Sequence, residues 1–244
     1  MFPPRHGIRA TRRPLSTALA AALLALALCP VPATAAGPGR YDHRRCGNTS
    51  QRVLLTLDDW PYGDDGRAVR VGSYLHGRGI RAAFFLINAY AARRPDITAT
   101  LRAQGHWVGN HSRSHRSLPE LPERDAREEI RGGLPSTLLR PPYGRFGDRE
   151  TRIAAALGYR ICTWTVDTRD WEGTGGEFPG PAALRAGVRA APAAAKRGGV
   201  VLGHLFTRFP EALPGIVDDL RSQGYGLCRS TGPTTSRIPY PLDC

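Results

Sequence analysis

Residues 53–59 read Val-Leu-Leu-Thr-Leu-Asp-Asp, a short apolar run that ends in two adjacent carboxylates. A run of this length with polar residues at its end is typical of a buried strand. Six later runs have the same character, and helix-like stretches lie between several of them. The predicted strands are 53–57, 82–87, 106–109, 137–139, 160–166, 200–202 and 225–228.

The stretches between these runs carry helix signals. Pro95 stands at a helix start, Gly158 and Gly224 stand at helix ends, and Pro192 predicts a break. The predicted helices are 67–76, 95–105, 148–157, 181–196 and 210–222. Short strands that alternate with helices predict an α/β fold with parallel strands. About seven such units in a single domain favour a distorted (β/α)7-type barrel over an open sheet.

The first 35 residues resemble an export signal. Arg5, Arg9, Arg12 and Arg13 precede an apolar run over 15–28, and Ala33-Thr34-Ala35 offers small residues for cleavage. The run is short for a membrane span, which needs about 20 residues. We therefore expect a secreted chain, extracellular or bound to the cell wall, with no stable membrane insertion after cleavage. An uncleaved anchor and the choice between the general and twin-arginine routes stay open.

Four cysteines remain after such cleavage: Cys46, Cys162, Cys228 and Cys244. An even number in an exported chain predicts two disulfides, and three pairings are possible. Cys228 with Cys244 is the plausible local pair, while Cys162 sits in an apolar run and could equally be a buried free thiol. The spacing argues against a zinc site made of thiolates.

The formal net charge of the whole sequence is +13. A basic excess is compatible with nucleic acid, a membrane surface or an anionic wall polymer, and export disfavours nucleic acid. Lys196 is the only lysine, so the preference for arginine could equally reflect genome composition without any binding role.

Polar residues gather where the predicted strands end, which is where parallel α/β proteins place function. Asp58 and Asp59 could share the binding of a cation and the acceptance of a proton, although such a pair also suits a solvated turn. His111 and His115 have i, i+4 spacing, which would put both rings on one side of a helical turn. Two histidines and one carboxylate leave positions open at a metal, as catalytic sites require.

Three more strand ends carry polar motifs. Arg140-Pro141-Pro142-Tyr143-Gly144 presents an arginine on a stiff loop, Asp167-Thr168-Arg169-Asp170-Trp171 puts acids beside an indole, and Leu202-Gly203-His204 ends in a histidine. Each alone could be structural: a rigid loop, a surface acid or a packed histidine. An acid beside a tryptophan also suits a sugar site, because aromatic faces stack on pyranose rings.

Taken in order, these motifs resemble those of the polysaccharide deacetylase family, carbohydrate esterase family 4, over roughly residues 52–228. That family carries Thr-Phe-Asp-Asp, His-x-x-x-His, Arg-x-Pro-Tyr, Asp-x-x-Asp-Trp and Leu-x-His. This chain supplies Thr56 to Asp59, His111 with His115, Arg140 to Tyr143, Asp167 to Trp171, and Leu202 to His204.

The resemblance implies a divalent metal bound by Asp59, His111 and His115. Zinc suits these ligands, and cobalt, nickel or manganese are compatible with them. The resemblance also implies that Asp58 is the general base and that Arg140 keeps it ionised.

The resemblance further implies that His204 is the general acid, oriented by Asp170, with Asp167 as a second member of that motif. Tyr143 would offer its backbone N–H to the oxyanion. Trp171 and Leu202 would shape the acetyl pocket.

Two departures bear on the substrate. Trp60 stands where the family has glycine after the paired acids, and its indole could narrow the cleft or stack on a sugar. Only 24 residues lie between His115 and Arg140, so the helix in that segment must be trimmed. Leu57 in place of phenylalanine is a minor change.

We therefore expect a signal peptide over 1–35, an N-terminal extension over 36–51, a deacetylase catalytic domain over 52–229 and a tail over 230–244. The expected activity is hydrolysis of N-acetyl groups on an amino-sugar polymer such as peptidoglycan or chitin, by a monomer. An O-acetyl xylan esterase and a wall-binding relative without catalysis remain alternatives. A metal-dependent phosphoesterase would need further ligands, and His43, His76 and His106 lie outside the motifs.

Overall fold

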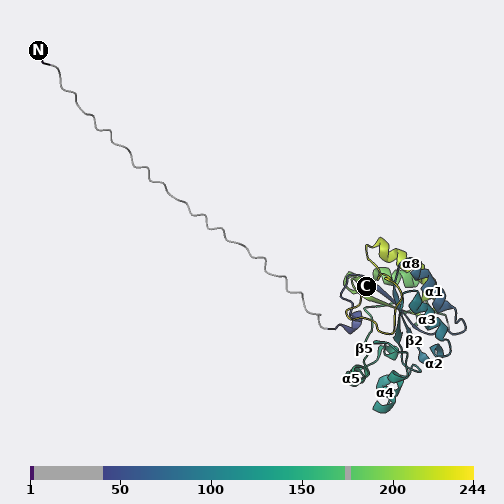
Figure 1. Cartoon of the computed structure of the whole chain (residues 1–244). Coiled ribbons are helices and arrows are strands. Elements are labelled where there is room, and N and C mark those ends of the chain that lie inside the picture. The colour runs from purple at the N-terminus through teal and green to yellow at the C-terminus, as the bar shows by residue number, and fades with distance from the viewer. Residues whose placement is uncertain (3–40, 174–176) are drawn as a thin grey trace. The chain divides into compact units, whose positions relative to one another are not determined.

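The computed structural model describes residues 1–2, 41–173 and 177–244 (Figure 1). Apart from its first two residues, the predicted signal peptide lies outside the described residues, as does the start of the predicted N-terminal extension. The described residues from Tyr41 onward belong to one compact unit. No helix among the described residues is both long enough and apolar enough to cross a membrane.

Seven strands form one sheet in the order β5-β4-β3-β2-β1-β7-β6, and every neighbouring pair is parallel. The strands are β1 (Leu54–Asp59), β2 (Ala82–Leu86), β3 (Trp107–Asn110), β4 (Leu138–Leu139), β5 (Arg160–Ile161), β6 (Val166–Asp167) and β7 (Val200–His204). The sheet curls into a half-barrel, with helices around its outside (Figure 1). The predicted distorted (β/α)7 barrel is confirmed.

Both faces of the central strands are buried, which explains their nearly continuous apolar sequence. Leu55 and Leu57 of β1 pack in a cluster with residues of the outer helices, whereas Leu54 packs in a second cluster with Phe85 of β2 and Trp107 of β3. Successive side chains of a strand point to opposite faces, so one run serves both clusters.

Eight α-helices and three 3-10 helices occur among the described residues. The α-helices are α1 (Arg67–His76), α2 (Asn88–Ala91), α3 (Pro95–Ala103), α4 (Glu123–Arg131), α5 (Asp148–Ala156), α6 (Pro181–Ala190), α7 (Ala193–Lys196) and α8 (Phe209–Ser222). The 3-10 helices are η1 (His43–Arg45), η2 (Leu118–Glu120) and η3 (Pro142–Gly144). The break predicted at Pro192 separates α6 from α7.

Two predicted strands were wrong. The run 160–166 divides into β5 and β6, which pair with β4 and β7 at opposite edges of the sheet. Between them the backbone N–H of Thr163 bonds to His43 instead of to a strand. The run 225–228 forms only an isolated bridge from Leu227 to Val53.

Two disulfides hold the segments that flank the sheet. Cys228 pairs with Cys244, as predicted for the local pair, and ties down the C-terminal tail. Cys46 pairs with Cys162 across 116 residues of sequence, so the alternative of a free thiol at Cys162 is wrong.

Candidate active site

The candidate ligand set forms where β1 and β3 end. One ligand atom from each of Asp59, His111 and His115 lies within 4.8 Å of the others. Nε2 of His111 and Nε2 of His115 are each 3.3 Å from Oδ1 of Asp59. The structure therefore brings together the three residues that the sequence placed at a metal.

The donor chemistry of this set fits a divalent cation. Oδ1 of Asp59 is buried without a hydrogen-bond partner, which is costly unless a cation satisfies it. Nδ1 of His111 is 2.7 Å from the carbonyl oxygen of Arg140, and a carbonyl only accepts, so Nδ1 carries a proton and Nε2 is the nitrogen that faces Asp59. Burial is the main cause that lowers the pKa of His115 to about 4, which leaves that ring neutral at pH 7.

The loop that carries the two histidines is irregular, so the helical turn predicted for them is wrong. Ser112 and His115 have φ values of 62° and 64°, in the left-handed region. The side chain of Asn110 accepts from the backbone of Ser112, and the Ser112 hydroxyl accepts from the backbone of His115. Glu129 of α4 accepts from both the backbone and the hydroxyl of Ser114. These bonds hold the strained loop and replace the helix that the spacing suggested.

Asp58 lies beside the ligand set in a fully enclosed position. Its Oδ1 accepts from Nη1 of Arg140 at 2.9 Å, and its Oδ2 is 3.8 Å from Nε2 of His111. Burial raises the pKa of Asp58, and the charge of Arg140 opposes that rise. A carboxylate with one oxygen held and a raised pKa is suited to accept a proton on the other oxygen.

His204 ends β7, opposite Asp58 in the parallel register of β1 with β7. Its Nδ1 is 2.8 Å from Oδ1 of Asp170, and its backbone N–H donates to Oδ2 of the same carboxylate. Burial disfavours the charged ring, but Asp170, Asp58 and Asp59 raise the pKa of His204 to about 9. The imidazole is therefore protonated at neutral pH, as a general acid requires.

The structure distinguishes the two acids of the motif 167–171. Asp170 is fully buried and holds His204, whereas Oδ1 of Asp167 accepts from the backbone of Arg169 at an exposed turn. The hydroxyl of Thr207 donates to Asp170, and the hydroxyl of Thr168, 3.2 Å from Oδ1 of Asp170, donates to the carbonyl oxygen of Leu202 at 2.7 Å. Sequence reasoning missed these two threonines, although Thr168 stands inside the motif itself.

The predicted substrate residues differ in accessibility. Trp171 is 48% exposed, but Leu202 and Trp60 are 2% and 3% exposed. Trp60 stacks on Tyr90 and donates its indole N–H to Asp65, which leaves little of the indole exposed for stacking on a sugar. The exposed aromatic ring of this loop is Tyr62, which sequence reasoning did not select.

Tyr62 is part of a row of aromatic rings that starts at the predicted acid. The ring of His204 lies 5.5 Å from Phe206, Phe206 lies 6.0 Å from Tyr62, and Tyr62 lies 5.1 Å from Tyr90, measured between centroids. A cavity of about 540 Å³ is lined by His115, Tyr143 and residues around η2. Tyr143 has a φ of 59° and packs its exposed ring against His115.

A curled parallel sheet with these carboxylates and imidazoles at its strand ends places the protein in the class of carbohydrate esterases with a deacetylase fold. The family model described as "Polysaccharide deacetylase" matches residues 47–162. The chain is 32% identical over 170 residues to the chitooligosaccharide deacetylase of Sinorhizobium fredii, covering 66% of this chain and 74% of that protein. The chain therefore belongs to the polysaccharide deacetylase family, carbohydrate esterase family 4.

Two further relatives show the range of this family. The chain is 30% identical over 152 residues to the peptidoglycan-N-acetylglucosamine deacetylase of Bacillus cereus, and the match spans 54% of each protein. A solved structure with TM-score 0.65 and 26% identity, covering 74% of this chain and 66% of the other, is a mutant with restored enzymatic activity of a family 4 pseudoenzyme from Bacillus anthracis. The family thus contains a member described as a pseudoenzyme. Family membership alone therefore does not establish activity, and the site residues must support it.

Proposed function

We propose that this protein is a secreted, metal-dependent deacetylase that removes N-acetyl groups from an amino-sugar polymer of the cell-wall or chitin type. The main observation behind the proposal is that a carboxylate suited to accept a proton and an imidazole suited to donate one lie on adjacent strands. Asp58, held by Arg140, and His204, held by Asp170, are register partners beside the Asp59, His111 and His115 set. Amide hydrolysis needs a base and an acid in opposite protonation states at the same pH, and this pair supplies both.

Asp59, His111 and His115 would hold the cation. A bound divalent cation polarises the acetyl carbonyl and lowers the pKa of water. Zinc suits the ligands, with cobalt, nickel and manganese as alternatives. Asp58 uses Oδ2 to take a proton from the attacking water, whose oxygen adds to the carbonyl carbon of the acetyl group. The backbone N–H of Tyr143 is assigned to the developing oxyanion.

His204 completes the reaction by donating the proton on Nε2 to the amide nitrogen as the carbon–nitrogen bond breaks. The products are acetate and a free amine on the sugar. The hydrogen bond from Nδ1 to Asp170 fixes the ring and favours its charged form. Amine departure without this proton would be slow, because an unprotonated amide nitrogen is a poor leaving group.

The surroundings of the site suit a polymer more than a small ester. The cavity is lined by the proposed ligand His115, and the aromatic row from His204 to Tyr90 begins at the proposed acid. Aromatic rings give stacking surfaces for sugar rings next to the one that is deacetylated. Trp171, also exposed, is assigned to the acetyl pocket with Leu202.

The test is acetate release by the purified protein from chitin oligomers, peptidoglycan and acetylated xylan, with and without a chelator. We expect release from the N-acetylated polymers, loss of release on chelation and recovery on adding metal. Release from acetylated xylan alone would instead support the O-acetyl esterase alternative, which needs the same residues. A failure to release acetate from any polymer after metal loading would support the alternative of a wall-binding relative without catalysis.

A further inference from the structure

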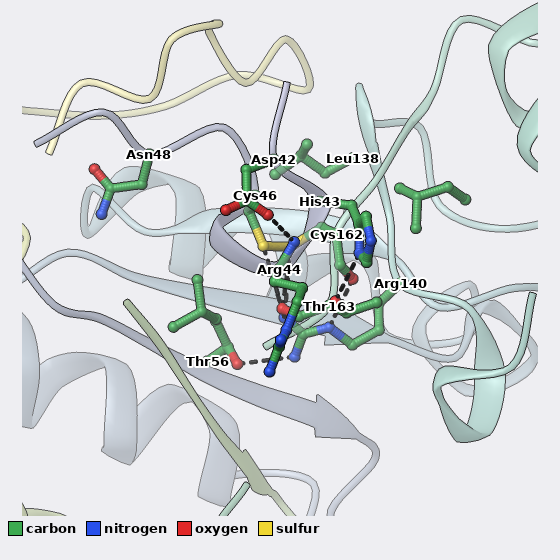
Figure 2. Close-up of a disulfide and its surroundings, with 12 residues drawn as sticks. Asp42, His43, Arg44, Cys46, Asn48, Thr56, Leu138, Arg140, Cys162 and Thr163 are labelled. Atoms are coloured by element: carbon green, nitrogen blue, oxygen red, sulfur yellow. Dashed lines mark hydrogen bonds between the residues drawn. A yellow bond between two sulfur atoms is a disulfide. The ribbon is translucent and has the colours of Figure 1, made fainter. Parts of the chain in front are cut away.

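The disulfide between Cys46 and Cys162 lies directly against the guanidinium of Arg140 (Figure 2). Nη2 of Arg140 is 3.4 Å from Sγ of Cys162 and 4.0 Å from Sγ of Cys46. All three residues are fully buried. The disulfide is therefore in contact with the residue that holds the proposed base.

The donors of Arg140 divide between two sides. Nη1 faces the reaction and bonds to Oδ1 of Asp58 and to the hydroxyl of Thr56. Nε and Nη2 face the disulfide and bond to the carbonyl oxygens of Cys162 and Thr163, at 3.1 Å and 2.9 Å. The position of Arg140 thus depends on two consecutive carbonyls that follow β5.

These carbonyls belong to the segment between β5 and β6, in which the backbone N–H of Cys162 still donates to the carbonyl of Leu139 in β4. The backbone N–H of Thr163 donates to the carbonyl of His43, and the hydroxyl of Tyr41 donates to the carbonyl of Ile161. Both partners lie in the N-terminal extension, and the bond from Cys46 to Cys162 is the covalent tie between that extension and the segment.

We propose that the Cys46–Cys162 disulfide is a positioning element for catalysis: it fixes the carbonyls of Cys162 and Thr163, which orient Arg140, which in turn orients Asp58. The proposal rests on the deacetylase function proposed above. Removing the bond lets the segment and its carbonyls shift. Arg140 can then follow them and leave Asp58 misaligned. Displacements of about 1 Å can cost on the order of 100-fold in rate.

The experiment compares two double variants. Cys46→Ala with Cys162→Ala removes the proposed positioning element. Cys228→Ala with Cys244→Ala is the matched control, because Cys228 bonds to Val53 just before β1, at the opposite end of that strand from Asp58. Acetate release is measured well below both melting temperatures with saturating metal. The hydrogen exchange of the Arg140 Nε–H is followed by NMR, and its signal is assigned from its absence in Arg140→Lys.

We expect the first variant to lose about 10- to 100-fold in kcat with little change in KM, and its Arg140 Nε–H to exchange faster than in the unmodified protein. The control should keep kcat, KM and the slow exchange. Unchanged kcat in the first variant, equal losses in both variants, or unchanged Nε–H exchange in the first variant would each overturn the proposal.

Two cases need a further measurement: a first variant that does not fold, and an unmodified protein that releases no acetate. If the first variant does not fold, Tyr41→Phe removes one bond of the extension to the segment and leaves the disulfide in place. It should give a smaller change in kcat and in Nε–H exchange in the same direction, and no change in either would count against the proposal. If the unmodified protein releases no acetate, the deacetylase function fails, while the exchange measurement still shows whether the disulfide fixes Arg140.

Discussion

The guanidinium of Arg140 and the carboxylate of Asp58 form an ion pair at 2.9 Å in which the two side chains are 0% and 3% exposed. A buried pair leaves a costly isolated charge when one partner is removed. We therefore expect Arg140→Met to destabilise the protein by about 3–5 kcal/mol, measured by urea unfolding. Arg145→Met breaks an exposed pair with Glu120 and should cost no more than about 1 kcal/mol. Similar losses of unfolding free energy in the two variants would show that burial does not set the contribution of the Arg140–Asp58 pair.

Asp58→Asn should abolish the proposed base without removing a proposed metal ligand. We expect kcat for acetate release to fall by about 100- to 10,000-fold, the usual range for general base catalysis. Metal content, measured after dialysis, should match that of the unmodified protein. Asp64→Asn, in the next loop, is the control and should keep kcat, since that carboxylate pairs with Arg67 and Arg70 at the surface. A fully active Asp58→Asn protein would remove Asp58 from the mechanism.

Asp170→Asn should shift the pH profile of kcat. His204 must be protonated to act as an acid, so activity declines as the pH rises through its pKa of about 9. Asp170 is the main group that raises this pKa, and its neutralisation should move the alkaline limb to lower pH. The profile of Asp167→Asn should keep its alkaline limb in place, because Asp167 bonds to the Arg169 backbone and not to His204. If the alkaline limb shifted only in Asp167→Asn, Asp167 instead of Asp170 would be the carboxylate that raises the pKa of His204.

His115→Ala should weaken cation binding. Two of the three ligands remain, so we expect a lower metal content after dialysis, and loss of the rise in melting temperature that a bound metal gives to the unmodified protein. Differential scanning calorimetry with and without zinc checks this. His76→Ala is the control, because His76 is exposed on α1 and bonds to the carbonyl of Gln104, away from the ligand set. An equal thermal shift in both variants would place the metal elsewhere.

Substitutions at Trp60 and Tyr62 should affect different properties, stability in the first case and substrate binding in the second. Trp60→Ala empties a buried position between Tyr90 and Asp65 and should cost about 3–5 kcal/mol of unfolding free energy. Tyr62→Ala removes a ring that is 51% exposed and should raise KM for long oligomers with little effect on stability. Chemical denaturation and kinetics on oligomers of increasing length test both statements. A KM effect from Trp60→Ala without destabilisation would restore the indole as a sugar platform.

The sequence predicted the site well where function depends on the ends of parallel strands. Asp58, Asp59 and His204 end strands that pair directly, so reading the strand ends was enough to bring them together. The resemblance also named Asp170 as the residue that orients His204, and the structure has Asp170 against that ring and Asp167, three positions earlier, bonded to the backbone of Arg169.

Features set by contacts between distant elements could not be predicted. The burial of Trp60 depends on Tyr90 from α2, and the pairing of Cys46 with Cys162 closes 116 residues. The loop of His111 and His115 was misread because i, i+4 spacing is not restricted to helices. Left-handed backbone at Ser112 and His115 brings the two rings to the same place.

Left-handed backbone recurs in the described part of this site, at Asp59 and Tyr143 as well as at Ser112 and His115. Each such residue costs on the order of 1 kcal/mol relative to glycine, and the barrel supplies the stability that sustains it. Efforts to make the enzyme more heat-resistant will therefore meet a conflict at these positions. Tyr143→Gly should raise the melting temperature, because glycine adopts this backbone conformation without strain. The same change should loosen the loop over the reacting groups. Stabilising substitutions are therefore better placed in the outer helices.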